Sequence, residues 1–441
     1  MARSAEKTND RKFTKIEKSW IMYDWANSVY ATNILAAIFP LYFGSVCQAN
    51  GADNLVLWSY GTSVATFLVA ILAPILGALG DHKGHKKKLF AGFLILGVVF
   101  TLCNAFTGDY RLLLVGYVIS HVGFSGSCLF YDSFLTDVTT PERMDRVSSW
   151  GYAMGYIGGS TIPFLLSIVL LFVMGQDNPV AFKLIIVLTS LWWAVFSIPM
   201  LKNVKQTHYI EAQKNLVRSS FSNLGRTAKE IFSQKGIFLF MLAYFFYIDG
   251  VNTVISISTS YGSKLGLNTV SMILALLVTQ IVAVPFSILF GKLAGKVGSI
   301  KVLCGAIVVY FCICVVGFFM GFNIEQHPGD ESALGLSLTL FWCMAFLVGT
   351  VQGGIQAISR SYFGKLVPAD RSNEYFGFFD IFGKFAAVIG PVLVGTFTQL
   401  TGRDSIGVIS LALLFLVGFL ILFFGRKTLF AQQASQSAAE E

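Results

Sequence analysis

Charge is what this sequence has least of. Only 13% of its 441 residues are Asp, Glu, Lys or Arg, against roughly 25% in soluble domains, while 55% are hydrophobic and the mean hydropathy is +0.67. This shortage of charge excludes a soluble globular enzyme and predicts an integral membrane protein with little mass outside the lipid bilayer. The net charge of +8 does not indicate nucleic-acid binding, because the basic residues lie in short loops rather than in one patch.

Several catalytic signatures are absent as well. The chain has no G-x-x-x-x-G-K-[ST] loop, which excludes an ATP-driven pump within it, and no G-x-S-x-G nucleophile elbow. Its five histidines are too few and too scattered for the metal centres of membrane oxidases. The seven cysteines form no C-x-x-C pair, so we expect neither a disulfide nor a metal site. The sequence therefore predicts no enzymatic activity, no metal and no cofactor.

Long apolar stretches are what the sequence does have. A membrane-spanning helix needs about 20 largely apolar residues. Twelve stretches qualify, namely 19–45, 56–80, 88–107, 111–136, 147–174, 181–201, 236–261, 268–292, 300–321, 334–362, 374–399 and 405–425. They predict an all-α membrane protein of twelve transmembrane helices in two pseudo-symmetric halves. The expected division is a tail (1–18), a six-helix half (19–201), a linker that is partly an amphipathic surface helix (202–235), a second half (236–425) and a tail (426–441).

The loops between these stretches give the orientation. Lysine and arginine concentrate in the tails, in the linker and in every second loop, whereas the alternate loops are acidic or neutral. By the positive-inside rule, both termini are expected in the cytoplasm of a multi-pass protein, which suits the inner (plasma) membrane of a bacterium. We expect the lipid bilayer as its surroundings, no nucleic-acid partner, and the chain to function as a monomer.

Carboxylates inside the apolar stretches are the strongest functional signal. A charged residue at a helix centre costs at least ~2.5–3.5 kcal/mol, so it usually faces water or a partner within a helix bundle. Asp24-x-x-Asn27 in the first stretch and Asp249-x-x-Asn252 in the seventh share one pattern, which indicates two related halves. Pro141-Glu-Arg143 is likewise echoed by Pro368-Ala-Asp-Arg371.

Four motifs carry a resemblance to a known family. The loop Gly77-Ala-Leu-Gly-Asp81-His-Lys-Gly84-His-Lys-Lys-Lys88 is similar to the signature of the major facilitator superfamily, with a degenerate copy at Gly291–Lys301. Tyr23-Asp-Trp-Ala-Asn27-Ser, Tyr131-Asp-Ser-Phe-Leu-Thr-Asp137 and Gly353-Gly-Ile-Gln356-Ala-Ile-Ser-Arg360-Ser resemble the vacuole-effluxer branch of that superfamily. This resemblance implies a twelve-helix permease that works by alternating access. Gly295 stands where the second loop copy would have an Asp, so a gate contact through that carboxylate should exist only in the first half.

The candidate gate residues lie in and beside that loop. Asp81 is expected to face the helix N-terminus near Ser372, where free backbone N–H groups attract an anion. Asp137, with Arg143 and Arg146, is expected at the cytoplasmic mouth as a gate or an interfacial ion pair. The full set of candidate gate residues is Gly77, Asp81, Gly84, Asp137, Arg143, Arg146 and Arg371.

The candidate substrate-binding or proton-binding residues lie deeper. They are Asp24, Asn27, His121, Asp132, Asp249, Asn252, Gln356, Asp380 and Lys384. Asp24 and Asp249 either line one central site or are packing elements bonded to neighbouring helices. His121 and Asp132 either relay protons or are satisfied by other partners. Asp380 and Lys384, one helical turn apart, form either a structural ion pair or part of a zwitterion-binding site.

These features favour a secondary transporter for a small-molecule substrate. Buried carboxylates can neutralise an ammonium group or carry a proton, so a small polar, amine-bearing solute such as an amino acid is the favoured substrate. Proton coupling is favoured over sodium coupling. A lipid-like or drug-like solute, suggested by the 41 phenylalanines, is the first alternative, and a receptor without transport is the second.

Overall fold

The computed structural model describes residues 12–175, 178–211 and 216–440, and nearly all of them are helical. The first half holds α2 (Lys15–Tyr30), η1 (Ala31–Ala36), α3 (Ile38–Ala49), α4 (Asn54–Gly80), α5 (Lys86–Asn104), α6 (Tyr110–Ser133), α7 (Leu135–Val138), α8 (Pro141–Met154), η2 (Gly155–Thr161), α9 (Ile162–Met174) and α10 (Pro179–Asn203). The linker contains α11 (Leu216–Ser233). The second half holds α12 (Lys235–Lys264), α13 (Thr269–Val297), α14 (Ser299–Gln326), α15 (Glu331–Leu366), η3 (Ala369–Arg371), α16 (Ser372–Phe385), α17 (Ile389–Thr401), α18 (Asp404–Ile409) and α19 (Ala412–Glu440).

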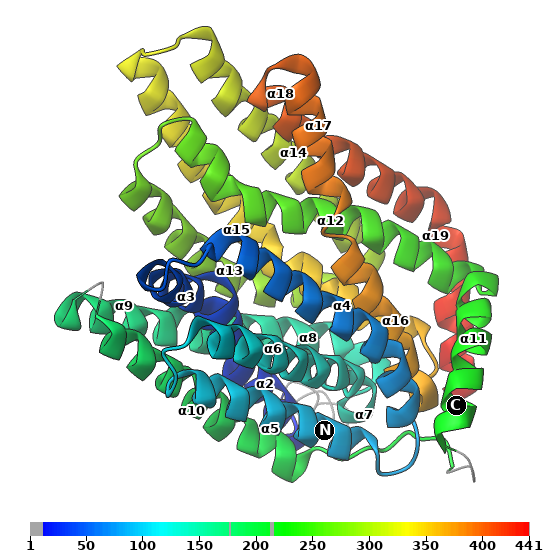
Figure 1. Ribbon diagram of the computed structural model, residues 1–441. Helices are drawn as coiled ribbons and strands as arrows, with labels where there is room; N and C mark the ends of the chain where they lie inside the picture. The colour runs from blue at the N-terminus through cyan, green and yellow to red at the C-terminus, as the bar shows by residue number, and fades with distance from the viewer. Residues whose placement is uncertain (1–11, 176–177, 212–215, 441) are drawn as a thin grey trace.

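Among the described residues, twelve helical segments are long and apolar enough to span a membrane, which confirms the twelve predicted spans. Figure 1 shows the bundle with its loops at the two ends of the spans. Many large apolar side chains remain exposed along these helices, Phe67, Phe172 and Leu400 among them. Such a surface is unfavourable in water but matches lipid. The protein is therefore a multi-pass integral membrane protein.

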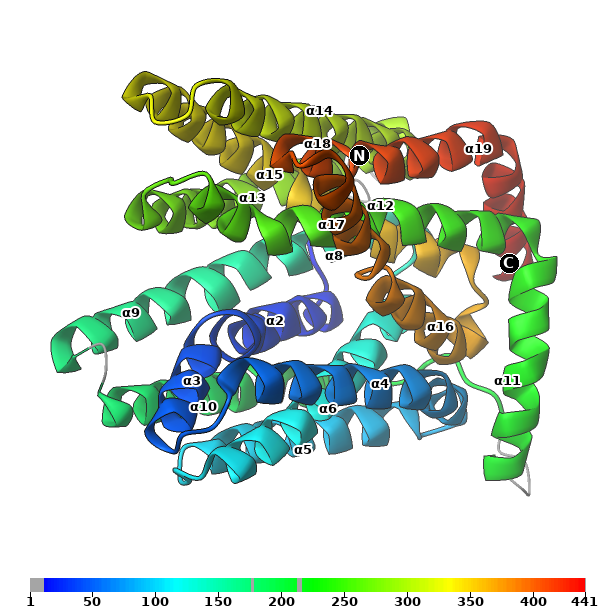
Figure 2. The same cartoon turned by 45° about the horizontal axis from the view of Figure 1, so that its top comes forward.

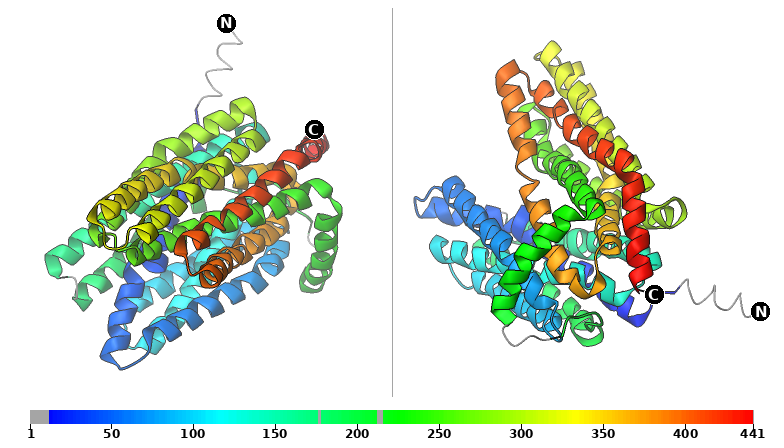
Figure 3. Two further views of the ribbon diagram at one scale, coloured as in Figure 1. Left: turned by 90° about the horizontal axis from the view of Figure 1, so that it is seen from above. Right: turned by 90° about the vertical axis from the view of Figure 1, so that its right-hand side faces the viewer.

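Each half has a hydrophobic core of its own. Residues from Trp20 to Val204 form one cluster of buried apolar side chains, and residues from Ile231 to Leu429 form the other. The end-on view shows the two groups of helices side by side (Figure 3, right). Because the halves are packed separately, their relative position depends on a limited set of contacts between them. Those contacts are the natural place to look for function.

Four of the described spans are interrupted rather than continuous; in the twelfth, α18 ends at Ile409 and α19 begins at Ala412. In the first and fifth spans, η1 and η2 are π-helical segments. A Cβ added to Gly158 would lie 1.8 Å from the Trp25 ring, so the glycine at this position allows α2 to approach η2 closely. The predicted span 374–399 is two helices, α16 and α17, separated at 386–388. That break exposes backbone N–H groups inside the membrane.

One end of the bundle collects the basic loops, and we call it the basic end. It carries the loop 81–85, the linker, the loop 367–368 and the last turns of α19. There α11 runs across the ends of the spans (Figure 2), and α19 continues as a helix through most of the predicted tail 426–441. Residues 1–11 of the predicted N-terminal tail, 212–215 of the linker and residue 441 lie outside the described residues.

Candidate transport site and gate

Arg360 is the central residue of the interface between the halves. It lies on α15 of the second half, its side chain is 4% exposed, and it reaches into the first half. Its Nη1 donates to Asp132 Oδ1 at 2.9 Å and its Nη2 to Asp24 Oδ2 at 3.1 Å. Its Nε and Nη2 also donate to the hydroxyl and carbonyl oxygens of Ser148, at 2.9 and 3.1 Å. One guanidinium thus neutralises two carboxylates and binds three helices of the opposite half, α2, α6 and α8.

Aromatic rings surround the same guanidinium. Its Cζ atom lies 4.7 Å from the ring centroid of Trp20, 5.3 Å from that of Tyr131 and 4.5 Å from that of Tyr152. The Tyr131 hydroxyl donates to Asp24 Oδ2 at 2.8 Å. Cation–π contacts of this kind stabilise a desolvated arginine and hold its plane in one orientation. The arginine is therefore fixed from all sides in this arrangement.

Three carboxylates and two cations form what we call the central charge cluster: Asp24, Asp132, Asp380, Arg360 and Lys384. Lys384 donates to Asp380 one helical turn away on α16, and the charge of Asp380 acts on Asp132 across the interface. With all five groups ionised, the cluster has a net charge of −1. The side chains of Asp132, Asp380 and Lys384 are 33%, 29% and 22% exposed, so solvent reaches them. Such a cluster can accept one further cation.

The other predicted binding residues lie around this cluster with partners of their own. Asn27 is buried one turn after Asp24, and Gln356 is half-buried on α15 one turn before Arg360. His121 Nδ1 lies 3.2 Å from the Tyr117 hydroxyl, and no bond joins it to Asp132 among the described residues. The predicted His121–Asp132 relay therefore lacks a direct contact here, although Lys384 acts electrostatically on His121.

Asp249 is placed differently from Asp24. Its two carboxylate oxygens both accept from the Gly390 N–H at 3.0 Å, and the Thr253 hydroxyl donates to it. This carboxylate caps α17 at the break in the eleventh span, where unpaired N–H groups need an acceptor. Asn252 follows on the same helix, half-buried. Among the described residues no bond joins Asp249 to Asp24, and the expectation that the two D-x-x-N signatures form opposite walls of one site stays a prediction.

The contact expected of Asp81 is present at the basic end. Its Oδ1 accepts from the backbone and side-chain nitrogens of Asn373 at 2.9 and 2.7 Å, and its Oδ2 from the Glu374 N–H at 3.0 Å. Burial raises the pKa of Asp81 to about 8, against the opposing effects of Lys86 and these N–H donors. A Cβ added to Gly77 would lie 2.4 Å from the Asn373 carbonyl oxygen, so glycine permits the close approach of α4 and α16.

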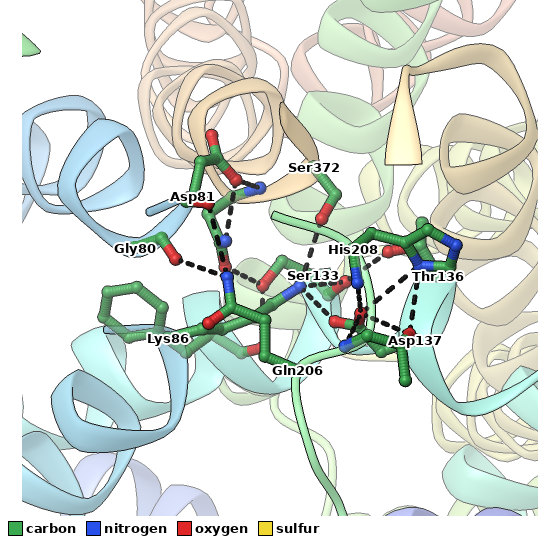
Figure 4. Close-up of polar contacts among 12 residues, drawn as sticks. Gly80, Asp81, Lys86, Ser133, Thr136, Asp137, Gln206, His208 and Ser372 are labelled. Atoms are coloured by element: carbon green, nitrogen blue, oxygen red, sulfur yellow. Dashed lines mark hydrogen bonds and ion pairs between the residues drawn. The ribbon is translucent and has the colours of Figure 1, made fainter. Parts of the chain in front are cut away.

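A buried lysine completes this network (Figure 4). Lys86 Nζ donates to Asp137 at 2.6 Å, to the Ser133 carbonyl at 3.0 Å and to the Ser372 hydroxyl of the second half at 3.1 Å. Burial alone would raise the pKa of Asp137, but Lys86 and the His208 N–H hold it below its usual value. Gly84, with φ +74°, forms the turn that directs Lys86 inward.

A further contact between the halves uses Asp145 of α8. This carboxylate accepts from the Ser361 hydroxyl at 2.6 Å, from Lys365 Nζ at 2.5 Å and from the Ser299 hydroxyl at 2.9 Å. Ser299 lies at the degenerate loop copy, where Gly295 leaves space empty. The acid that the second loop lacks is thus supplied by the opposite helix.

The three arginines predicted for the gate each have a partner outside the Asp81 and Lys86 network, and the gate role of Arg143 and Arg146 with Asp137 stays a prediction. Arg143 binds Glu17 through two bonds of 2.8 Å, and Arg146 lies over the Phe13 ring at 4.4 Å. Arg371 binds Glu230 of α11 at 2.6 Å. The arginines fasten the chain start and the linker helix to the bundle.

Sequence reasoning missed Arg360, Asp145, Lys365 and Lys86 as functional residues. Arg360, Lys365 and Lys86 lie near the ends of apolar stretches, where the positive-inside rule alone accounts for a basic residue, although all three are buried or nearly so. One signal for Arg360 was available, because it lies inside the predicted span 334–362. Asp145 and Lys86 gave no such signal, since each lies just outside a predicted span.

Comparisons with known proteins agree with this fold. Three solved structures match most of the chain: a bacterial homologue of the iron transporter ferroportin in an outward-facing state (14% identity, TM-score 0.65, 93% of this chain and 98% of that one), the proton:xylose symporter XylE (12%, 0.68, 94% and 95%) and the E. coli fucose:proton symporter FucP (16%, 0.66, 93% and 97%). At these identities the likeness shows the fold, which is that of major facilitator superfamily transporters.

The family follows from sequence. The model of the family described as "Vacuole effluxer Atg22 like" matches residues 55–428. The MFS-type transporter YxiO of Bacillus subtilis is 46% identical, over 94% of this chain and 95% of its own length. Autophagy-related protein 22-1 of Aspergillus fumigatus is 24% identical, over 90% and 78%. The chain belongs to the vacuole effluxer Atg22-like family and is an MFS-type transporter rather than an enzyme.

Proposed function

We propose that this permease carries a small zwitterionic solute of the amino-acid type, with proton coupling, through the central charge cluster. The observation that carries the proposal is the composition of that cluster: carboxylates and cations meet between the halves with one negative charge in excess. An ammonium group can replace part of the positive charge around Asp132 and Asp380, while Lys384 can receive a carboxylate. A proton can serve as the compensating cation when no solute is bound.

The proposed cycle exchanges bonds between the halves for bonds to the solute. The basic end is taken as cytoplasmic, with both termini inside the plasma membrane of a bacterium, because lysine and arginine concentrate there. The contacts of Asp81, Asp145 and Arg360 then close the cytoplasmic side, so that the present arrangement faces outward. Moving to the inward-facing arrangement separates Arg360 from Asp24 and Asp132, which then need a proton or an ammonium group in its place.

Gate roles are proposed for the two contacts nearest the cytoplasm. Asp81 with Lys86 closes α4 against α16, and Asp145 with Lys365 closes α8 against α15. Gly77 and Gly84 allow that approach. We expect one chain to complete the cycle alone, because both walls of the cluster come from the same chain.

The test is counterflow in vesicles that contain the purified protein. Vesicles are loaded with one unlabelled amino acid at a time, and entry of the same labelled amino acid is followed with and without an imposed pH gradient. Accumulation of at least one amino acid that increases with the pH gradient supports the proposal. Counterflow of a lipid-like or drug-like solute, with none for any amino acid, would replace it by the alternative substrate class.

A further inference from the structure

A surface pocket at the basic end adjoins the gate loop through Gly84 and Gln206 and lies outside the central charge cluster. Its walls are the loop after α4, the start of α5 and the first residues of the linker. Four lysines line it: Lys83, Lys87, Lys88 and Lys205. Lys83 is paired with Glu211 at 3.3 Å. Within the described residues, no carboxylate pairs with the other three.

Convergence of these ammonium groups is the unusual feature. The positive-inside rule explains lysines at this end of the bundle but not their arrangement around one pocket. Lys87 and Lys205 come from different segments of the chain and are close enough to interact electrostatically. Like charges held together are favourable only when an anion compensates them. A phosphate group, with several oxygens and a negative charge, suits three ammonium donors.

The helix below the pocket identifies the source of that phosphate. Lys88, Gly92, Ile95 and Val99 follow one another at helical spacing along one face of α5. Ile95 is 59% and Val99 44% exposed, and a Cβ added to Gly92 would meet nothing within 4 Å. An open apolar stripe therefore descends from the pocket into the lipid-facing surface. This combination fits a phosphate that carries acyl chains.

We infer that the pocket binds one anionic phospholipid, with its headgroup phosphate between Lys87, Lys88 and Lys205 and an acyl chain along the Gly92–Val99 stripe. This site goes beyond the proposed function, because it lies on the lipid-facing surface of the basic end, away from the solute site, and binds a component of the membrane.

The bound lipid would also act on the gate. Gln206, in the wall of the pocket, donates from Nε2 to the carbonyl oxygens of Gly80 and Asp81 at 3.1 and 3.3 Å, and accepts from the Gly84 N–H at 2.9 Å (Figure 4 shows the first two). A headgroup that bridges Lys205 and Lys88 holds this linker segment against the gate loop. It therefore stabilises the arrangement in which the halves are joined at the basic end.

Lipid binding is tested directly, without reference to transport. The purified protein is titrated with phosphatidylglycerol in phosphatidylcholine nanodiscs, and the lipid retained per chain is counted by native mass spectrometry. Neutralising Lys87, Lys88 and Lys205 together by Gln substitution should weaken retention on the order of 100-fold, or roughly fivefold per lysine. The matched control is the triple Gln variant of Lys292, Lys296 and Lys301, which removes the same charge at the same end of the other half and should retain the lipid as the wild type does.

Three results would overturn the inference. Both triple variants could lose the lipid equally, in which case general surface charge is responsible. The pocket variant could retain it unchanged. Inorganic phosphate at millimolar concentration could displace it completely, in which case the acyl chain contributes nothing. If the triple variant does not fold, the single Lys88→Gln variant, at an exposed position, should still show the fivefold loss.

Discussion

Replacing Arg360 by Gln should release the two halves from each other at the basic end. The substitution leaves Asp24 and Asp132 without the cation that neutralises them and removes two bonds to Ser148. Loss of one member of a buried ion pair costs about 3–5 kcal/mol. Because Asp132 is 33% exposed, the lower figure applies, and about 3 kcal/mol shifts the populations of the two arrangements on the order of 100-fold.

The assay is a distance measurement between spin labels at Glu142 on α8 and Lys296 on α13, both exposed at the basic end. The wild type should show mainly one short distance, and Arg360→Gln a dominant longer one. Arg360→Lys keeps the charge but not the planar fork, so it should give an intermediate result. Arg371→Gln is the control, because Arg371 binds only the linker and its own half. An unchanged distance in Arg360→Gln would refute the reasoning.

Three further predictions concern the other contacts. Gly77→Ala, whose Cβ would lie 2.4 Å from the Asn373 carbonyl oxygen, should lengthen the same label distance, whereas Gly305→Ala on α14, whose Cβ would meet nothing within 4 Å, should not. Asp249→Asn should lower thermal stability by about 1–2 kcal/mol through loss of the charged cap on α17, measured as a lower melting temperature; an unchanged value would remove the capping role. When the two halves are in contact at the basic end, the pKa of Asp81 is raised to about 8, against about 3.9 for an exposed Asp. At pH values between these two pKa values, bringing the halves into contact therefore binds one proton to Asp81. Raising the pH from 5 to 9 should therefore lengthen the label distance in the wild type and leave it constant in Asp81→Asn; a wild-type distance that shortens as the pH rises would contradict this sign.

The sequence was sufficient for the fold because a bilayer imposes simple rules. Length and hydropathy located twelve spans, and the loop around Asp81 indicated the superfamily. The contact of Asp81 with the α16 N-terminus could also be anticipated, since an acid near free N–H groups is a local relation with a known physical cause.

The partners of the other buried charged residues could not be predicted from the sequence. Arg360 meets Asp24 across 336 positions of chain, and nothing in the local sequence around either residue records that distance. Asp249 shares a pattern with Asp24, yet its role is set by the break at 386–388, which hydropathy does not reveal. Asp145 replaces a missing acid on the opposite helix, which only the packing of the halves explains.

The central claim is that solute binds at the Asp132 side of the interface and not at Asp249. Counterflow of the transported amino acid, measured in parallel for Asp132→Asn and Asp249→Asn at equal amounts of folded protein, tests it most directly. The account predicts that Asp132→Asn loses counterflow and that Asp249→Asn retains it below its lowered melting temperature. Normal counterflow in Asp132→Asn together with its loss in Asp249→Asn would contradict the account and place the site at the α12–α17 contact.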